Sequence, residues 1–340
     1  MQQLTRNGFA RAAEFLAREA RPLERALFAF RFTGADAGPV REALAAYRNP
    51  DGGFGRALEP DVRTPASSAY LTAIALTTLA EIGATQDDEL VAGAARHLAA
   101  AYDRGGMVWP ILPPEAQAAP RAPWWNDRGG EGPFRRLSET FDGFRIIPRA
   151  RIVDGLVRLG AGESIPEFAP LLHDTLATIA EAGTDALGGG GGAFVDAACL
   201  ATNPALTNGA ATGGGVSVAD ATGAPESART AELVRAAREN LARRLPDLVE
   251  TRPEAWSSYS AGPVKLLAEP SPLAGASLAP AIDAHLDYLV DRQTADGSWE
   301  PNWTWMGEYP QEWERARAEW KGIVTLETLT SLRAYARIES

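Results

Sequence analysis

The sequence predicts an all-α protein, and three observations carry that prediction. Apolar residues recur with helical spacing along most of the 340 residues, and no segment shows the sustained alternation that is typical of a strand. Glycine-rich turns separate the helical segments. One of these turns, Asp51-Gly52-Gly53-Phe54, returns near the C-terminus as Asp296-Gly297-Ser298-Trp299. A recurrence of this kind indicates that one helical unit is repeated along the chain.

Five helices are expected in the N-terminal part of the chain. Pro22 is placed to begin the second of them, because proline is favoured at the first helical position. Thr64 and Pro65 provide an N-cap and a first residue for the fourth, which Gly83 ends. The segment 103–109 follows the fifth and is interpreted as a worn third copy of the turn. These helices cover residues 8–20, 23–32, 40–47, 66–82 and 89–102.

Two interruptions divide the remainder of the chain. Prolines, glycines and arginines at about 105–145 predict a lid-like loop, because loops of that length are usually functional or disordered. A glycine-rich stretch at about 185–225 predicts a flexible insertion. Further helices are expected at 149–159, 165–182, 226–245, 278–292, 311–320 and 323–338. Phe54 and Trp299 lie 245 residues apart, which is five steps of 49 residues. The sequence therefore predicts five or six helical hairpins that close into a ring, as a single domain of residues 1–340.

The composition limits the classes of function. The chain carries 44 acidic and 33 basic residues, and its net charge of −11 disfavours nucleic acid as a partner, since that needs a basic surface. One cysteine and three histidines without ligand-like spacing predict no disulfide framework and no metal site, and no cofactor is expected. The N-terminus does not read as a secretory signal, and the longest apolar run is too short to cross a bilayer. A cytoplasmic protein without a transmembrane segment is expected, and its oligomeric state is left open.

The two turns resemble repeats of known families. Gln293, Gly297 and Trp299, which follow Tyr288-Leu289, resemble the QW repeat of squalene–hopene cyclases and related terpene cyclases. The Asp51–Phe54 turn resembles the glycine-rich repeat of protein prenyltransferase β subunits. The whole chain resembles uncharacterised bacterial members of the same superfamily, the "prenyltransferase and squalene oxidase repeat" proteins. This resemblance implies an α/α toroid with an apolar central cavity, in which the glutamine caps backbone groups and the aromatic ring stacks over the turn. Other matching segments are Glu59-Pro60-Asp61, Pro123-Trp124-Trp125-Asn126 and Asn302-Trp303-Thr304-Trp305.

The resemblance also implies a place for a proton donor. Class II terpene cyclases protonate an alkene with the middle aspartate of a D-x-D-D motif at the mouth of an inner helix. Glu59 and Asp61 match the first two acids of that motif, and Val62 replaces the third. Asp61 is therefore the candidate catalytic acid and Glu59 its partner, although Arg63 beside them would favour an ionised carboxylate. The alternative is that one of these acids caps the following helix and pairs with Arg63.

Tryptophans on predicted loops are candidates for binding a substrate. The chain has nine tryptophans, and an aromatic face stabilises a cation by roughly 0.5–2 kcal/mol or stacks on a sugar ring. The alternative is that these rings pack loops onto the helices. The predicted substrate-binding residues are Trp124, Trp125, Asn126, Trp303, Trp305 and Arg63. Seven arginines between Arg121 and Arg151 could hold a diphosphate group, or could pair with the local acids Glu131, Glu139 and Asp142.

Three functional hypotheses follow. The leading one is a terpene-cyclase-like enzyme that cyclises or isomerises an apolar isoprenoid by protonation, with peripheral membrane contact left open. The second is an enzyme similar to (α/α)₆ glycosidases, which would use two carboxylates of the segment 308–319. Glu312 and Glu319 share a helix face there, but Arg315 between them also fits a charged surface helix. The third is a toroid that binds a peptide or a lipid and catalyses nothing.

Overall fold

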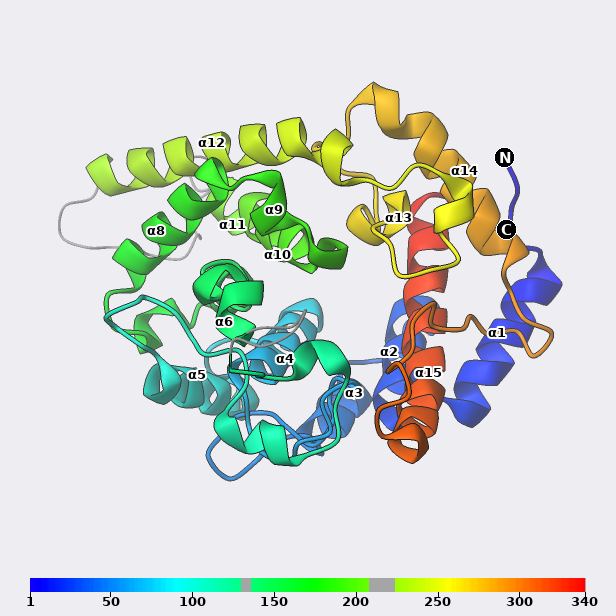
Figure 1. Cartoon of the computed structure of the whole chain (residues 1–340), viewed down its shortest axis with the longest axis horizontal. Coiled ribbons are helices and arrows are strands. Elements are labelled where there is room, and N and C mark those ends of the chain that lie inside the picture. Colours follow the sequence, from blue (N-terminus) through cyan, green and yellow to red (C-terminus); the bar gives the residue numbers. More distant parts are fainter. Residues whose placement is uncertain (130–135, 208–223, 340) are drawn as a thin grey trace. The chain divides into compact units, whose positions relative to one another are not determined.

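The computed structural model describes residues 1–129, 136–207 and 224–339. Within these ranges the chain is helical, and four isolated bridges are its only β-type pairings (Figure 1). The all-α prediction is confirmed. The chain divides into two compact units: unit 1 comprises residues 1–46, 120–123 and 246–340, and unit 2 comprises residues 47–119 and 124–245. No helix in the described ranges combines the length and hydrophobicity that a membrane span requires.

Unit 2 is built around three helices that are largely buried. The helix α7 (Arg149–Leu159) packs against both α4 (Ala69–Glu81) and α10 (Gly192–Ala201). Gly155 lets α7 approach α4 closely, since a Cβ at that position would lie 2.8 Å from the Cβ of Leu76. The helix α5 (Glu89–Ala101) packs on α4, and α8 (Phe168–Glu181) packs on α7 and α10. The unit also contains α6 (Leu137–Thr140), α9 (Thr184–Leu187), α11 (Pro204–Thr207) and α12 (Ala224–Leu248) as far as residue 245.

Unit 1 joins the two ends of the chain. The helix α15 (Pro310–Ala334) packs against α1 (Arg6–Glu19) and α2 (Pro22–Thr33). Leu4 N donates to Arg337 O at 2.7 Å and Glu339 N donates to Leu4 O at 3.0 Å, so that the two ends lie side by side (Figure 1). The remaining helices of this unit are α3 (Gly38–Ala45), α13 (Pro263–Leu266) and α14 (Ala279–Asp291).

Two predicted helices have different limits in the structure. The prediction that α4 begins at residue 66 is wrong, because Ser68 rather than Thr64 is its N-cap: Ser68 Oγ accepts from Leu71 N at 3.1 Å. The segments 311–320 and 323–338 were predicted as separate helices but belong to the single helix α15. Gly322 does not end a helix there. A Cβ on Gly322 would lie 3.0 Å from the Cβ of Ala20, so this glycine allows close packing on the end of α1.

The predicted flexible insertion at 185–225 is wrong for the part that the structure describes. Residues 184–207 include the helices α9, α10 and α11, and Phe194 and Leu200 of α10 are fully buried. Burial of this apolar face stabilises the helix α10 in spite of the glycines that precede it. Residues 208–223 lie outside the described ranges. The described part of the stretch 105–145 holds short helical turns, and its role as a lid remains a prediction. The arrangement of all helices as one domain remains a prediction as well.

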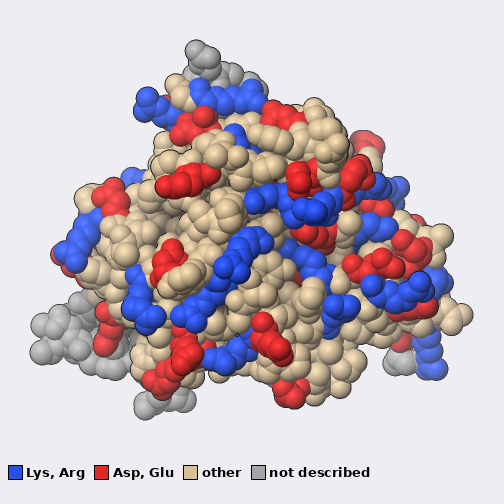
Figure 2. All heavy atoms as spheres, turned by 90° about the horizontal axis from the view of Figure 1, so that it is seen from below, with Lys and Arg blue, Asp and Glu red and all other residues tan. Residues whose placement is uncertain are grey.

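Charges of both signs cover the surface. On the face shown in Figure 2, the Lys and Arg side chains are interspersed with Asp and Glu. Some form exposed ion pairs, such as Arg18 with Glu14 at 3.2 Å. An exposed pair adds only about 0–1 kcal/mol to stability.

Candidate functional site

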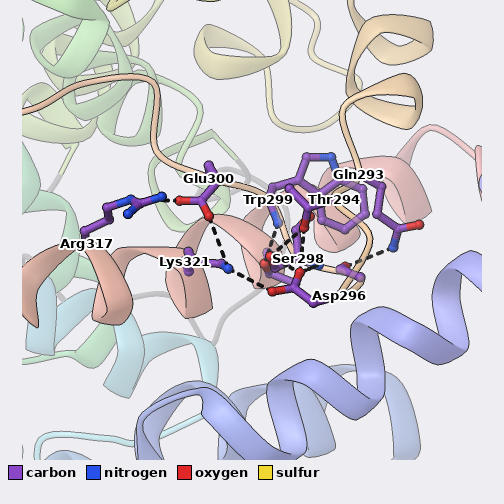
Figure 3. Close-up of polar contacts among 10 residues, drawn as sticks. Gln293, Thr294, Asp296, Ser298, Trp299, Glu300, Arg317 and Lys321 are labelled. Atoms are coloured by element: carbon purple, nitrogen blue, oxygen red, sulfur yellow. Dashed lines mark hydrogen bonds and ion pairs between the residues drawn. The ribbon is translucent and has the colours of Figure 1, made fainter. Parts of the chain in front are cut away.

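The C-terminal copy of the turn clamps α14 to α15 (Figure 3). The carboxylate of Asp296 accepts from the backbone N of Ser298 at 3.1 Å and from its Oγ at 2.6 Å. The indole Nε1 of Trp299 donates to Leu289 O of α14 at 2.7 Å. The backbone N of Trp299 donates to Thr325 Oγ1 of α15 at 3.0 Å. These hydrogen bonds fix the turn itself and join it to α14 and α15.

Gln293 has the role that the family resemblance implies. Its amide Nε2 donates to Gly297 O in its own turn at 2.9 Å and to Gly8 O of α1 at 2.8 Å. The amide therefore joins the turn to a helix from the other end of the chain. The prediction that this glutamine satisfies backbone groups is confirmed.

The DGGF turn of unit 2 repeats the same design. Asp51 Oδ1 accepts from Gly53 N at 3.0 Å, as Asp296 does from Ser298 N. The backbone N of Phe54 donates to Thr72 Oγ1 of α4 at 3.1 Å, as that of Trp299 does to Thr325. The segment 103–109 retains part of the pattern, because the indole Nε1 of Trp109 donates to the α5 carbonyl of Leu98 at 2.7 Å. These turns are structural elements, and the chemistry has to be sought elsewhere.

One position of the repeat differs between the two units. Arg48 occupies the place of Gln293, three residues before the turn aspartate. Its guanidinium lies against Gly93 of α5, and its Nε is buried without a hydrogen-bond partner in the described ranges. A buried donor left in this state costs free energy. Arg48 therefore lowers the stability of unit 2.

We expect Arg48→Gln to stabilise the protein. A glutamine there can donate to Gly52 O as Gln293 donates to Gly297 O, which should raise the free energy of unfolding by about 1 kcal/mol. Urea unfolding followed by circular dichroism measures the gain, and Arg96→Gln on the exposed face of α5 is the matched control. An unchanged or lowered midpoint for Arg48→Gln would contradict the equivalence of the two positions.

A chain of ion pairs ties the C-terminal turn to α15 (Figure 3). Lys321 Nζ lies 2.9 Å from Asp296 Oδ2 and 3.1 Å from Glu300 Oε1, and Arg317 Nε lies 3.1 Å from Glu300 Oε2. Burial would raise the pKa of Asp296, but hydrogen bonds from Ser298, Thr294 and Lys321 hold it far below its usual range. This carboxylate is firmly ionised and is not a proton donor.

The two candidate acids lie in a closed loop ahead of α4. Arg56 N donates to Thr64 O at 2.9 Å and closes the loop. Within it, Asp61 is 2% exposed and Glu59 is 8% exposed, whereas Arg63 is half-buried. Because Ser68 caps α4, neither acid has the capping role that was the structural alternative. Asp and Glu side chains are rarely fully buried unless they are paired.

Aromatic rings extend from the first turn of α4. The rings of Tyr70 and Trp125 lie 4.9 Å apart, and Trp125 stacks on Phe141 with ring centroids 5.4 Å apart. Trp125 and Asn126 are buried, and Trp124 is half-buried. Trp125 therefore lies at the N-terminal end of α4, which is the end that follows the loop with Glu59 and Asp61.

The second pair of predicted tryptophans belongs to unit 1. Trp303 is half-buried and packs edge-on against Trp320 of α15, with ring centroids 4.9 Å apart. Trp305 is fully buried, and its ring lies 5.8 Å from that of Trp313. Both anchor the loop before α15. That they also line a substrate cavity with Trp124 and Trp125 remains a prediction.

In the described part of the arginine-rich stretch, Arg149 and Arg151 lie on the helix α7 and not in a loop. Arg149 is fully buried, and its Nη1 lies 2.6 Å from Asp174 Oδ2, while its Nη2 donates to Thr178 Oγ1 at 2.8 Å. Neither alternative given for the stretch, a diphosphate or the local acids, describes the partners of Arg149 and Arg151, which come from α8 and α10. Arg149 joins helices and is removed from the set that could hold a diphosphate.

A polar cluster on α7 and α10 is absent from the sequence predictions. Arg151 Nε donates to Asp196 Oδ1 at 2.7 Å, and Arg151 Nη2 lies 2.7 Å from the same oxygen. One helical repeat further on, Arg158 Nε lies 2.9 Å from Asp154 Oδ2, and the buried Asn203 donates to Asp154 Oδ1 at 2.8 Å. Two signals could have revealed the cluster. One is the 3–4 spacing of charges in the apolar helix α7, and the other is a single acid in the apolar segment 193–201.

The only cysteine of the chain belongs to this cluster. The Cys199 side chain is exposed on α10, yet the packing around its sulfur and the nearby carboxylates of Asp154 and Asp196 raise its pKa to about 11. At neutral pH this residue is a protonated thiol and a slow nucleophile. It offers a chemical label next to Arg151 rather than a catalytic group.

The carboxylates of α15 belong to a charged helix surface. Arg315 Nη1 lies 3.5 Å from Glu312 Oε2, and Arg317 Nη1 lies 3.7 Å from Glu314 Oε2. Both pairs link residues three apart on one helix. This arrangement favours the surface-helix alternative over a glycosidase-like pair of catalytic carboxylates.

Comparison with known proteins does not identify a family for this chain. No protein-family model matches the chain, and no curated protein matches it. In the ranges that the structure describes, no three His, Cys, Asp or Glu side chains are grouped so that they could hold a metal ion.

Proposed function

We propose that this protein is a terpene-cyclase-like enzyme that protonates an apolar isoprenoid and cyclises or isomerises it. The observation that carries the proposal is the pair of buried carboxyl groups, Asp61 and Glu59, in the loop that leads into α4. The aromatic rings of Tyr70, Trp125 and Phe141 extend from the first turn of the same helix. An acid and a set of aromatic faces are the two things that such a reaction needs.

The proposed reaction begins at Asp61. The reaction requires the protonated form of this carboxyl group, which is the form that carries a proton to donate. The O–H bond of Asp61 breaks as the electron pair of an alkene forms a new C–H bond, and the positive charge remains on the more substituted carbon. A second double bond attacks that carbon to close a ring, and loss of a proton from a neighbouring carbon ends the sequence. Glu59 would be the partner that positions the acid.

The aromatic rings would stabilise the cationic intermediates. A ring face contributes roughly 0.5–2 kcal/mol of cation stabilisation, with the larger values where water is excluded. Trp125 is buried and contacts two other rings, so that its orientation is fixed. Trp124, Asn126, Trp303, Trp305 and Arg63 remain candidates for further contacts with the substrate.

The proposed architecture for this reaction is an α/α toroid. Its support is the equivalence of the turns at Asp51–Phe54 and Asp296–Trp299, with the same hydrogen bonds to the following helix. The joining of the first and last residues of the chain in unit 1 is a further feature that a closed ring requires. The cytoplasmic location stays a prediction from the sequence.

The test of the proposal is product analysis with the Asp61→Asn variant. Purified protein is incubated with squalene and with prenyl diphosphates of several lengths, and extracts are read by gas chromatography–mass spectrometry. We expect a cyclic or rearranged product that disappears in Asp61→Asn, since asparagine keeps the size of the side chain but has no acidic proton. Glu81→Gln, an exposed acid at the other end of α4, is the control and should retain the product.

Two outcomes would count against the proposal. A product that persists in Asp61→Asn would remove Asp61 as the acid while leaving an isoprenoid reaction in place. No product from any isoprenoid, with thermal unfolding showing a folded protein, would contradict the enzymatic assignment itself.

A further inference from the structure

We infer that unit 2 binds a free α-amino acid with an apolar side chain, in a cavity between α11 and α12. The cavity has a volume of about 290 Å³ and opens to solvent. Its lining residues come from the end of α11 and from residues 231–239 of α12. None of them belongs to α4 or to the loop of Glu59 and Asp61. The site is therefore additional to the one proposed for the reaction.

Both walls of the cavity are anchored to the rest of unit 2. The amide Nδ2 of Asn240 donates to Ile179 O at 2.8 Å and to Ala182 O at 3.0 Å, which fixes α12 to the end of α8 (Figure 1). On the other side, the buried Asn203 directly precedes α11 and donates to Asp154 Oδ1 of α7 at 2.8 Å. A cavity between anchored walls is formed before a ligand arrives, as small-molecule sites usually are.

Three charged side chains line the cavity, and the protein neutralises none of them. In the part of the chain that the structure describes, the side chains of Arg235, Arg238 and Glu239 make no hydrogen bond or ion pair. Arg235 and Glu239 are four residues apart on one helix, which is a spacing at which opposite charges commonly pair. Because they do not pair here, both signs of charge are available to a ligand.

The rest of the lining is mainly apolar. It includes Leu206 of α11 and Ala231 and Val234 of α12, and Val234 is only 4% exposed. A ligand that fills this cavity therefore needs an apolar part as well as charged groups. A volume of 290 Å³ has room for roughly ten water molecules. Leucine and phenylalanine have a similar number of non-hydrogen atoms, so ligands of this size fit.

An α-amino acid supplies the partners that the three charged groups lack. Its carboxylate suits the guanidinium groups of Arg235 and Arg238, which lie three residues apart on one face of α12. Its ammonium group suits the carboxylate of Glu239, and its side chain would be buried against Leu206 and Val234. A phosphate or a plain carboxylic acid would instead bring a second negative charge next to Glu239, and like charges placed together cost free energy.

Isothermal titration calorimetry of the full chain tests the site. The probes are L-leucine, L-methionine and L-phenylalanine, and we expect at least one of them to bind with a dissociation constant below about 1 mM. For an amino acid that binds, the analogue without the ammonium group and the analogue without the carboxylate should each bind about tenfold or more weakly. For leucine these analogues are 4-methylpentanoate and 3-methylbutylamine.

Two results of this titration would overturn the inference. Failure of all three amino acids to bind would show that the cavity is not an amino-acid site. Equal binding of the analogue without the ammonium group would show that the site recognises a simple anion and that Glu239 has no part in it.

Two variants separate the two charges of the ligand. Arg238→Gln should weaken binding of the amino acid by about tenfold or more, because it removes a charged donor from the carboxylate. Glu239→Gln should weaken the amino acid similarly but leave the analogue without the ammonium group unaffected, a difference that a merely structural role would not produce. Arg229→Gln, an exposed arginine of α12 outside the cavity, is the control and should bind normally.

Unchanged affinity in both Arg238→Gln and Glu239→Gln, with circular dichroism showing folded proteins, would place the ligand elsewhere and contradict the inference. The site can also be tested apart from the proposed reaction. Asp61→Asn should bind the amino acid with unchanged affinity, since Asp61 does not line this cavity.

Discussion

Replacing Gly297 with alanine should lower the free energy of unfolding by about 2–6 kcal/mol, because backbone strain and overpacking add at this position. Gly297 has a φ of +90°, which an alanine adopts only under strain. A Cβ there would also lie 2.4 Å from the backbone C of Arg11 and 2.5 Å from its O. That contact is with the backbone of α1, which cannot move aside as a flexible side chain could. The turn would have to leave the helix that it clamps.

A matched control separates the two causes of this loss. Gly83 has a φ of +73°, and a Cβ there would meet nothing within 4 Å. Gly83→Ala should therefore cost only the conformational part, about 1–2 kcal/mol. Urea unfolding of the two variants gives the comparison. Equal losses would show that the approach of the turn to α1 contributes nothing.

Replacing Arg149 with methionine should lower the free energy of unfolding by about 3–5 kcal/mol, because it removes a fully buried guanidinium from its ion pair with the partly exposed Asp174 and from its hydrogen bonds. The Arg149 side chain is fully buried and also donates from Nε to Arg145 O at 2.8 Å. Methionine would leave Asp174 without its nearest cation, and Thr178 and Arg145 O would each lose the hydrogen bond that Arg149 donates. Thermal and urea unfolding would measure the loss.

Arg145 offers a control with the same acid. Its Nη2 lies 3.8 Å from Asp174 Oδ2, but its side chain is 53% exposed. Arg145→Met should therefore cost less than about 1 kcal/mol, as exposed ion pairs do. If both variants lost the same stability, burial would not be what makes Arg149 important. The same result would reopen the possibility that the arginine belongs to a ligand site.

The sequence predicts the helices of this protein well where the signal is local. The helix at 149–159 has the predicted limits, and Pro22 begins α2 as its fixed φ allows. The predicted helix ends are wrong where a contact with a residue far along the chain determines the structure. Gly322 suggests a helix end by itself, yet it lies inside α15, where the missing side chain makes room for Ala20 at the end of α1. The helix α10 was missed because its neighbouring glycines obscured a short apolar face.

The candidate site is less predictable than the fold for the same reason. Glu59 and Asp61 could be chosen from the sequence because a known motif places acids before a helix, and their burial came only with the structure. The partners of Arg149 and Arg151 lie 25 and 45 residues away on other helices, whereas the sequence offered nearer acids. Asp196 belongs to no recognisable motif, and its contact with Arg151 depends on the packing of α10 against α7.

Deuterium incorporation tests the central claim of proton-initiated chemistry most directly. The Asp61 carboxyl exchanges with solvent, so an enzyme equilibrated in D₂O should place a single deuterium in each product molecule, at the carbon that is protonated first. Mass spectrometry of the product gives the number of deuterium atoms, and nuclear magnetic resonance gives their position. A product that contains no deuterium would show that the cation arises in another way, such as loss of a leaving group, and would contradict the role proposed for Asp61.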